Sequence, residues 1–264
     1  EFPQSSLARK AGIQLGLLYY NDNQPEKALA AYKQVISNYP GSEEAKIALQ
    51  DLKSVYIDLN DINAYASYVN SIGGNIRLEV GEQDSLTYIA AEKLFMRGDN
   101  DGARRSLINY LQTFPEGAFS SNANFYLGSI AFAKKEFDEA IQRFKSVIAS
   151  GDTKFLEESV ARTAEIEYLS KDYPAALESF KRLQIVAENP ENRQAARLGI
   201  MRCALQTGQQ KDALLAADEL LKEPKLSPEL EAEARYVRAK AYIAQKQANK
   251  ALADLKELSK DTRT

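Results

Sequence analysis

The sequence predicts an all-α protein built from about seven stacked helix pairs. A short motif, in which a polar turn is followed by a helix that opens on a small residue, recurs along the chain. Upstream of each turn, apolar residues recur three and four positions apart, as in Leu15, Leu18 and Tyr19, which is the periodicity of a helix. No segment alternates strictly enough to predict a strand. An antiparallel array of fourteen helices is therefore expected.

The spacing of this motif sets the number of helix pairs, which we call repeats. Successive alanines of the motif are separated by 75, 37, 36, 37 and 38 residues, at Ala28, Ala103, Ala140, Ala176, Ala213 and Ala251. The first gap equals two periods. A further repeat is therefore expected near residue 65, where NDINAYASYV supplies a polar turn and Tyr65 stands at the alanine position.

The domain organisation follows from these seven repeats. Residues 1–72 hold repeats 1 and 2, and residues 85–264 hold repeats 3 to 7 of one continuous solenoid. Between them, residues 73–84 are expected to form an irregular linker, because Gly73, Gly74 and Gly81 punctuate this stretch. The chain starts on Glu1 rather than Met, and we expect it to be part of a longer protein.

Small residues and prolines give the repeats a physical basis. Gly16, Gly128 and the motif alanines leave room for two helices to approach to about 8 to 10 Å. Pro40 and Pro115 are expected to end the second helices of their repeats, because proline lacks the backbone donor and disfavours helical geometry in the residue before it.

This set of residues resembles the tetratricopeptide repeat, whose period is about 34 residues. The resemblance covers nearly the whole chain and is carried best by repeats 1 and 4, with Leu15, Gly16, Tyr19, Ala28, Tyr32 and Pro40 in the first and Leu127, Gly128, Ala140 and Phe144 in the other. Tyr65 and Val69 in repeat 2 and Glu167 in repeat 5 depart from the family pattern. The resemblance implies a right-handed superhelical solenoid with a concave groove.

The resemblance also implies which residues line that groove and bind a protein or peptide. Aligned first-helix positions hold Ile13, Leu17, Tyr20, Tyr88, Glu92, Phe95, Phe125, Ser129, Phe132, Glu165, Tyr168, Arg202, Tyr236 and Lys240. Aromatic members are candidate anchors, although Phe95, Phe125 and Phe132 could instead pack against a neighbouring repeat. The family's peptide-end clamp uses Lys and Asn at positions that here hold Ile13 and Leu17, so that mode of capture is not expected.

Composition excludes several functional classes. The absence of histidine rules out Ser-His-Asp and Cys-His triads and histidine-bearing zinc sites. The single cysteine, Cys203, is expected to be a buried, small apolar residue. With 34 basic and 37 acidic residues and no long run of like charge, nucleic acid is not an expected partner. We expect no catalytic residue, cofactor, metal site or transmembrane segment.

Two alternatives to a binding scaffold remain. The chain could be a structural spacer inside a larger solenoid, with possible self-association at its exposed ends, because terminal repeats normally need polar caps. It could instead be a helical-toroid glycosidase that uses two carboxylates such as Glu92 and Glu165. The absence of tryptophan, the best platform for stacking sugars, argues against the second alternative.

Two sequence segments indicate where the protein is located in the cell. AYKQVISNYPGSEEAKIAL at residue 31 and FPEGAFSSNANFYLG at residue 114 resemble helix ends of bacterial cell-envelope tetratricopeptide proteins, namely the Tol-Pal-associated periplasmic factor and the outer-membrane-assembly lipoprotein. This resemblance implies the periplasm or cell envelope. A cytoplasmic location is the alternative.

Overall fold

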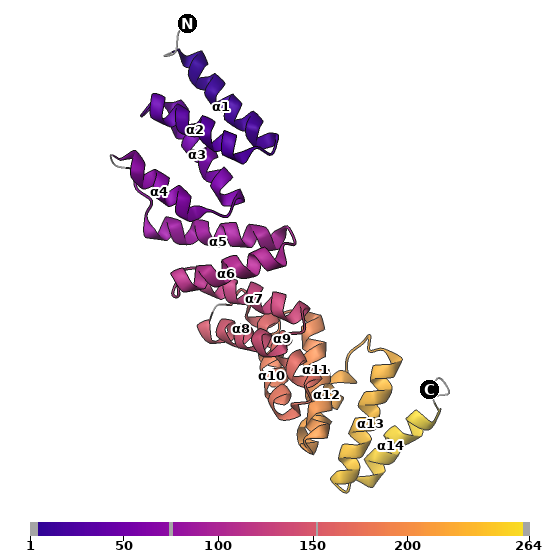
Figure 1. Ribbon diagram of the computed structural model, residues 1–264. Helices are drawn as coiled ribbons and strands as arrows, with labels where there is room; N and C mark the ends of the chain where they lie inside the picture. The colour runs from indigo at the N-terminus through magenta and orange to yellow at the C-terminus, as the bar shows by residue number, and fades with distance from the viewer. Residues whose placement is uncertain (1–4, 74–75, 152, 261–264) are drawn as a thin grey trace. The chain divides into compact units, whose positions relative to one another are not determined.

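The computed structural model describes residues 5–73, 76–151 and 153–260, which form fourteen α-helices and no strand (Figure 1). This confirms the predicted fold class. The helices are α1 (Ser6–Asn21), α2 (Pro25–Asn38), α3 (Glu43–Asp58), α4 (Ile62–Ile72), α5 (Val80–Met96), α6 (Asn100–Thr113), α7 (Ser120–Ala133), α8 (Phe137–Ser150), α9 (Leu156–Leu169), α10 (Tyr173–Val186), α11 (Pro190–Gln206), α12 (Gln210–Leu220), α13 (Pro228–Ala244) and α14 (Ala248–Lys260). None of the helices in the described ranges is long and apolar enough to cross a membrane.

The chain divides into two compact lobes, Glu1–Ala123 and Asn124–Thr264. In the N-terminal lobe α1 packs on α2 and α3, and α5 packs on α3, α4 and α6. In the C-terminal lobe each helix from α8 to α14 packs on the next one along the chain, and α11 also contacts α9 and α13. First helices of successive repeats therefore lie against one another, which is the arrangement of a solenoid.

The linker predicted at residues 73–84 is shorter in the structure. Residues 76–79 have no regular structure, but α5 begins at Val80 and includes Gly81. Gly74 lies outside the described residues, and the division between the lobes falls at Ala123 rather than in this segment. Gly81 is tolerated because it occupies the first turn of α5, whereas a glycine in a helix interior would cost more.

One turn is repeated inside every helix pair. The residue five positions before each motif alanine, or before Tyr65, has a left-handed backbone with φ between 54° and 83°; these residues are Asn23, Asn60, Gly98, Lys135, Lys171, Gly208 and Lys246. The next residue donates its N–H to a carbonyl five positions back, as from Gln24 to Tyr19 at 2.8 Å and from Asp61 to Tyr56 at 3.0 Å. This bond belongs to the Schellman type of helix end. The predicted repeat near residue 65 is thereby confirmed.

The left-handed turn predicts a stability difference between two glycines that both have open space around them. Gly208 has φ +73°, whereas Gly81 is helical, and a Cβ added at either would meet nothing within 4 Å. Gly208→Ala should lower the free energy of unfolding by about 1 kcal/mol, because an L-residue is strained in this region. Gly81→Ala, the matched control, should leave it unchanged or raise it by up to about 1 kcal/mol. Urea denaturation measures both, and equal effects would contradict this account of the turn.

The motif alanines are buried in the helix packing. All six are at most 2% exposed, and Tyr65 is also buried. A Cβ built on Gly16 would lie 2.5 Å from Cε1 of Tyr32, and one built on Gly128 would lie 2.8 Å from Cε1 of Phe144. In each case the first helix rests on an aromatic ring of the second helix. The predicted role of these glycines is therefore confirmed.

Two buried carboxylates are satisfied by neighbouring helices. Glu167, which departs from the family pattern, forms an ion pair with Lys145 at 3.2 Å and accepts a hydrogen bond from the Ser179 hydroxyl at 2.5 Å. Asp84 accepts from the Tyr110 hydroxyl at 2.5 Å and from the backbone N–H of Ala118 at 2.9 Å. Burial, assisted by the bond to Asp84, raises the pKa of Tyr110. Buried polar groups that have partners in this way do not oppose folding.

Cys203 is fully buried, as predicted. Burial raises the pKa of its thiol to about 11, an effect that the nearby Arg202 only partly opposes. The thiol therefore stays protonated at neutral pH, and it behaves as a small apolar side chain.

Close packing at the motif alanines predicts the effect of enlarging one of them. Ala140 is fully buried on α8, whereas Ala149 on the same helix is exposed. Ala140→Leu should lower the free energy of unfolding by about 1 to 3 kcal/mol, because the added atoms overpack the helix pair. The control Ala149→Leu should change it little. Thermal and urea denaturation would test this, and a neutral Ala140→Leu would refute the assigned register.

Candidate functional site

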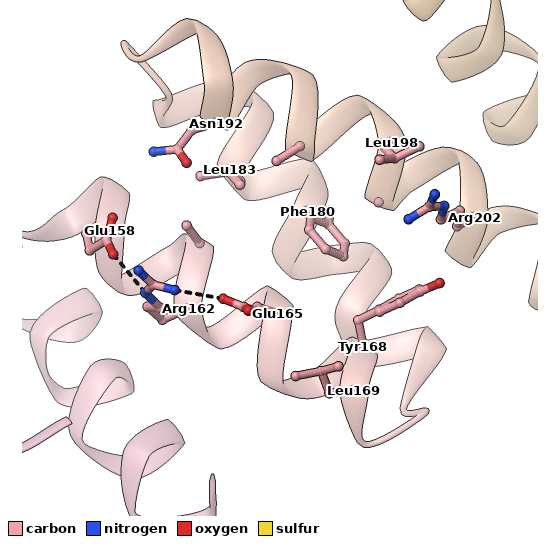
Figure 2. Close-up of a pocket in the computed structure, with 13 residues that line it drawn as sticks. Glu158, Arg162, Glu165, Tyr168, Leu169, Phe180, Leu183, Asn192, Leu198 and Arg202 are labelled. Carbon is pink, nitrogen blue, oxygen red and sulfur yellow. Dashed lines mark hydrogen bonds and ion pairs between the residues drawn. The ribbon is translucent and has the colours of Figure 1, made fainter. Parts of the chain in front are cut away.

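The C-terminal lobe holds a pocket of about 390 Å³ bounded by α9, α10 and α11 (Figure 2). Its size is that of a small ligand or side-chain site. The lining residues are Glu158, Ala161, Arg162, Glu165, Tyr168, Leu169, Phe180, Leu183, Asn192, Ala195, Leu198, Gly199 and Arg202.

Helical spacing explains how these side chains come together. The α9 members recur three or four positions apart, at Glu158, Ala161 or Arg162, Glu165 and Tyr168, and so share one face of that helix. On α11 the corresponding face carries Ala195, Leu198 or Gly199, and Arg202. Because α9 and α11 are the first helices of successive repeats, this pocket lies on the face that the sequence predicted to form the groove.

Gly199 places α11 directly over the pocket floor. A Cβ on Gly199 would lie 2.4 Å from the Phe180 ring, so no larger residue fits while the ring keeps its position. Phe180 is consequently only 8% exposed, and its ring meets Tyr168 edge-on at 6.4 Å. Together with Leu183 and Leu198 these rings form an apolar floor, while Leu169 lies at the mouth and is exposed.

One edge of the pocket carries a charged triad on α9. Arg162 donates from Nε to Glu158 at 2.8 Å and from Nη1 to Glu165 at 3.0 Å, as Figure 2 shows. Its guanidinium also lies 4.9 Å from the centre of the Phe132 ring, within cation–π distance. Burial by itself lowers the pKa of Arg162, but the two carboxylates outweigh it and raise this pKa above its ordinary value.

The opposite edge carries Arg202, whose charge is already paired. Its Nε and Nη2 donate to the two oxygens of Glu233 on α13, both at 2.7 Å. This bidentate bond is the main cause of the raised pKa of Arg202, against the opposing effect of burial. Fork-like pairing of this kind fixes both side chains in one geometry. Arg202 therefore links α11 to α13 at the edge of the pocket.

Asn192 lines the pocket at the start of α11 and is held in place by Glu157. The Asn192 amide donates to Glu157 at 2.7 Å, and Glu157 also accepts the backbone N–H groups of Glu188 and Asn189, at 2.9 and 3.2 Å. Burial raises the pKa of Glu157, but these hydrogen bonds outweigh it and leave the pKa below its ordinary value. The start of α11 is thus tied to α9.

Three of the predicted groove residues, Glu165, Tyr168 and Arg202, meet in this pocket. Elsewhere in the same lobe, Tyr236 and Lys240 are exposed on α13, with the Lys240 ammonium 5.6 Å from the Tyr236 ring. Ser129 is half-buried, and its hydroxyl donates to the Phe125 carbonyl at 2.9 Å.

The predicted aromatic anchors on α7 serve mainly in packing. Phe125 stacks on Phe155 with ring centres 4.2 Å apart, and both Phe125 and Phe132 pack against the buried cluster around Phe144. Phe132 is only half-buried, and its ring faces Arg162. Phe125 therefore fits the alternative prediction, packing against a neighbouring repeat, better than a role as an anchor for a partner.

In the N-terminal lobe the prediction of groove residues needs correction. Ile13 and Tyr88 are buried, the first in the hydrophobic core formed by α1 to α5 and the second beneath Phe119, whose ring stacks on it at 4.5 Å. Neither offers a surface to a partner. Tyr88 donates to Glu92 at 2.6 Å.

The other predicted residues of the N-terminal lobe remain at least partly accessible. Leu17 is exposed, and Phe95 is half-buried. The Tyr20 hydroxyl donates to Asp58, which also pairs with Lys93 and, at 3.0 Å, with Arg97. Tyr20 is thus held by a local charge cluster.

Alignment of the repeats did not identify the floor of the pocket or the arginine at its α9 edge. Phe180 and Leu183 belong to the second helix of their repeat, and Arg162 was not among the aligned first-helix positions. A glycine inside an expected helix, Gly199, was the available signal, because such a residue costs about 1 kcal/mol unless close packing requires it. Among the described residues, no group of three or more Cys, Asp or Glu side chains could hold a metal ion.

The helix hairpins, their shared turn and their small-residue contacts define a solenoid of repeated helix pairs. Models of the tetratricopeptide repeat match residues 11–42 and 90–153. The chain therefore contains tetratricopeptide repeats.

The chain is similar to several solved structures at low sequence identity. YrrB, described as a TPR protein with an unusual peptide-binding site, has a TM-score of 0.50 and 18% identity over 66% of this chain and 83% of its own. The C-terminal part of a TPR repeat-containing protein from Cytophaga hutchinsonii has a TM-score of 0.49 and 16% identity over 93% of each chain. MamA has a TM-score of 0.46 and 17% identity over 70% of this chain and 95% of its own. No curated protein matches the sequence.

Proposed function

We propose that this protein is a non-catalytic scaffold that binds a peptide or helical segment of a partner protein in the groove formed by α9, α10 and α11. The observation that carries the proposal is the pocket itself. It combines an apolar floor, made by Phe180, Leu183 and Leu198, with polar groups at its edges. This combination is typical of sites that bury one side chain of a ligand and orient it with a few hydrogen bonds.

The fold supports the same conclusion. Tetratricopeptide repeats generally mediate protein–protein interactions, and stacked repeats present extended surfaces suited to that task. YrrB, which shares the fold, is described as having a peptide-binding site. A fold alone does not establish a function, so the proposal rests on the pocket first.

A role as a glycosidase has less support. Glu165, the better placed of the two candidate carboxylates, is paired with Arg162 at 3.0 Å. Glu92 belongs to the other lobe, where it accepts the Tyr88 hydroxyl.

The proposal includes a location in the periplasm or cell envelope of a bacterium. It rests on the resemblance of residues 31–49 and 114–128 to envelope tetratricopeptide proteins. The start of the full-length gene tests it. A start with neither a secretion signal nor a lipidation cysteine would favour the cytoplasm instead.

Filling the pocket should abolish partner binding without unfolding the protein. Ala195 lines the pocket but is exposed, so Ala195→Trp occupies the space without changing its charge. The immobilised protein should retain a partner from envelope or cytoplasmic extract, and Ala195→Trp should lose it. Ala149→Trp, exposed on α8 outside the pocket, is the matched control and should retain the partner. Retention by all three proteins would reject this pocket as the binding site.

Exposed leucines favour a second candidate function, that of a structural spacer or self-associating segment. On α1, Leu7 and Leu18 are 75% and 63% exposed, and on α14 Leu252 is 50% exposed. Apolar faces of this kind are normally covered in a solenoid, by further repeats or by a second copy.

Leu18→Glu tests self-association. If α1 packs on another copy, sedimentation velocity should show an assembly that depends on protein concentration, and Leu18→Glu should convert it to monomer, because a charge is costly to bury in an apolar contact. Leu215→Glu, at a similarly exposed leucine on α12, should leave the assembly intact. A monomer at all concentrations would count against self-association.

A further inference from the structure

We infer that the pocket between α9, α10 and α11 selects partner segments in which a lysine or arginine flanks the inserted apolar side chain, and that it rejects acidic segments. The inference rests on the proposed function and specifies the chemistry of the partner.

The α9 edge of the pocket has spare capacity to accept hydrogen bonds from a cation. Glu158 and Glu165 each use one oxygen for Arg162, Oε1 and Oε2 respectively. Across the described chain, no donor reaches the other oxygen of either carboxylate. Their side chains are 43% and 46% exposed, so both free oxygens are accessible to a ligand.

The charges of the pocket are unequal once internal pairs are taken into account. On α9, two carboxylates face one guanidinium, which leaves one negative charge. On α11, Arg202 is neutralised by its bidentate bond to Glu233, in which both N–O distances are 2.7 Å. Glu157, next to Glu158 on α9, is a further carboxylate, but it faces Arg193 and three hydrogen-bond donors, so the excess negative charge comes from Glu158 and Glu165. The field near the pocket mouth therefore favours a cation.

An acidic partner would meet unfavourable groups at both edges. A carboxylate approaching Arg162 must compete with two carboxylates already bound to it, and one approaching Arg202 must compete with Glu233. Repulsion between the ligand carboxylate and these glutamates opposes binding. The glutamates that attract a cation therefore also exclude an acidic partner.

The geometry allows an apolar side chain and a cation to bind together. Phe180 and Leu198 line the pocket from α10 and α11, and Glu158 and Glu165 lie along its α9 edge (Figure 2). The long aliphatic stem of a lysine or arginine can cover the exposed Leu169 while its charged end reaches a glutamate. A partner with both groups would satisfy the floor and the edge at once.

Three pools of synthetic 12-residue peptides test this selection. Each pool has leucine fixed at the centre and mixed residues elsewhere, and the pools differ only in the residue fixed two positions from the leucine, which is lysine, serine or glutamate. Fluorescence polarisation with the whole 264-residue chain should rank binding as lysine pool above serine pool above glutamate pool. The preference for lysine should weaken as salt is raised.

Charge-neutral variants distinguish the source of the preference. Glu158→Gln and Glu165→Gln should each weaken binding of the lysine pool by about two- to five-fold, the range expected of partly exposed ion pairs. Glu178→Gln, whose side chain is 75% exposed on α10 outside the pocket, is the matched control and should have no effect. Arg162→Gln should keep or increase the preference for lysine, because it releases two carboxylates. Circular dichroism confirms that each variant is folded.

The possible failures are distinguishable. Binding that Ala195→Trp abolishes but that favours the glutamate pool, or that Arg162→Gln destroys, would overturn the inference and leave the proposed function standing. Binding of equal strength in all three pools would also overturn it. If no pool binds, or if Ala195→Trp changes nothing, the proposed function of this pocket fails as well.

Discussion

The structure depends on how closely the two helices of each pair approach one another. In each repeat a residue with a left-handed backbone reverses the chain between the two helices. Five positions later, the second helix buries a residue, which is an alanine in six repeats and Tyr65 in the other. Glycines at positions 16 and 128 allow the facing aromatic rings to lie against bare backbone. Each pair is thereby set in one geometry, and the stacking of pairs follows from the faces that this geometry leaves apolar.

The same constraint explains why the fold could be predicted from the sequence. The alanines and prolines report local packing, so their spacing revealed seven repeats even where Tyr65 replaces alanine. Asn60 keeps the turn of that weak repeat, because asparagine tolerates the left-handed region better than most residues. Lysines occupy the same position in three other repeats, where the turn residue alone gave no signal. The backbone geometry is thus more regular than the sequence that encodes it.

The site was harder to predict because it depends on contacts between repeats. Alignment placed both Tyr88 and Tyr168 at groove positions, yet Phe119 covers the first while the second borders a pocket. Phe119 belongs to the segment between two repeats, which no alignment of helices describes. Phe180 likewise reaches the pocket floor only because Gly199 lets α11 pass over its ring. Contacts of this kind depend on pairs of residues in different helices, and a periodic sequence pattern does not predict them.

Repetition therefore fixes the backbone and leaves the rim of the pocket free to vary. The buried Glu167, which pairs with Lys145 and Ser179, holds α8, α9 and α10 together from the far side of α9, away from Glu158 and Glu165. Changes at those two glutamates would alter charge without loosening that support. A scaffold built in this way can acquire a preference for one class of partner at little cost in stability, because the residues that recognise the partner and the residues that hold the helices together are different ones.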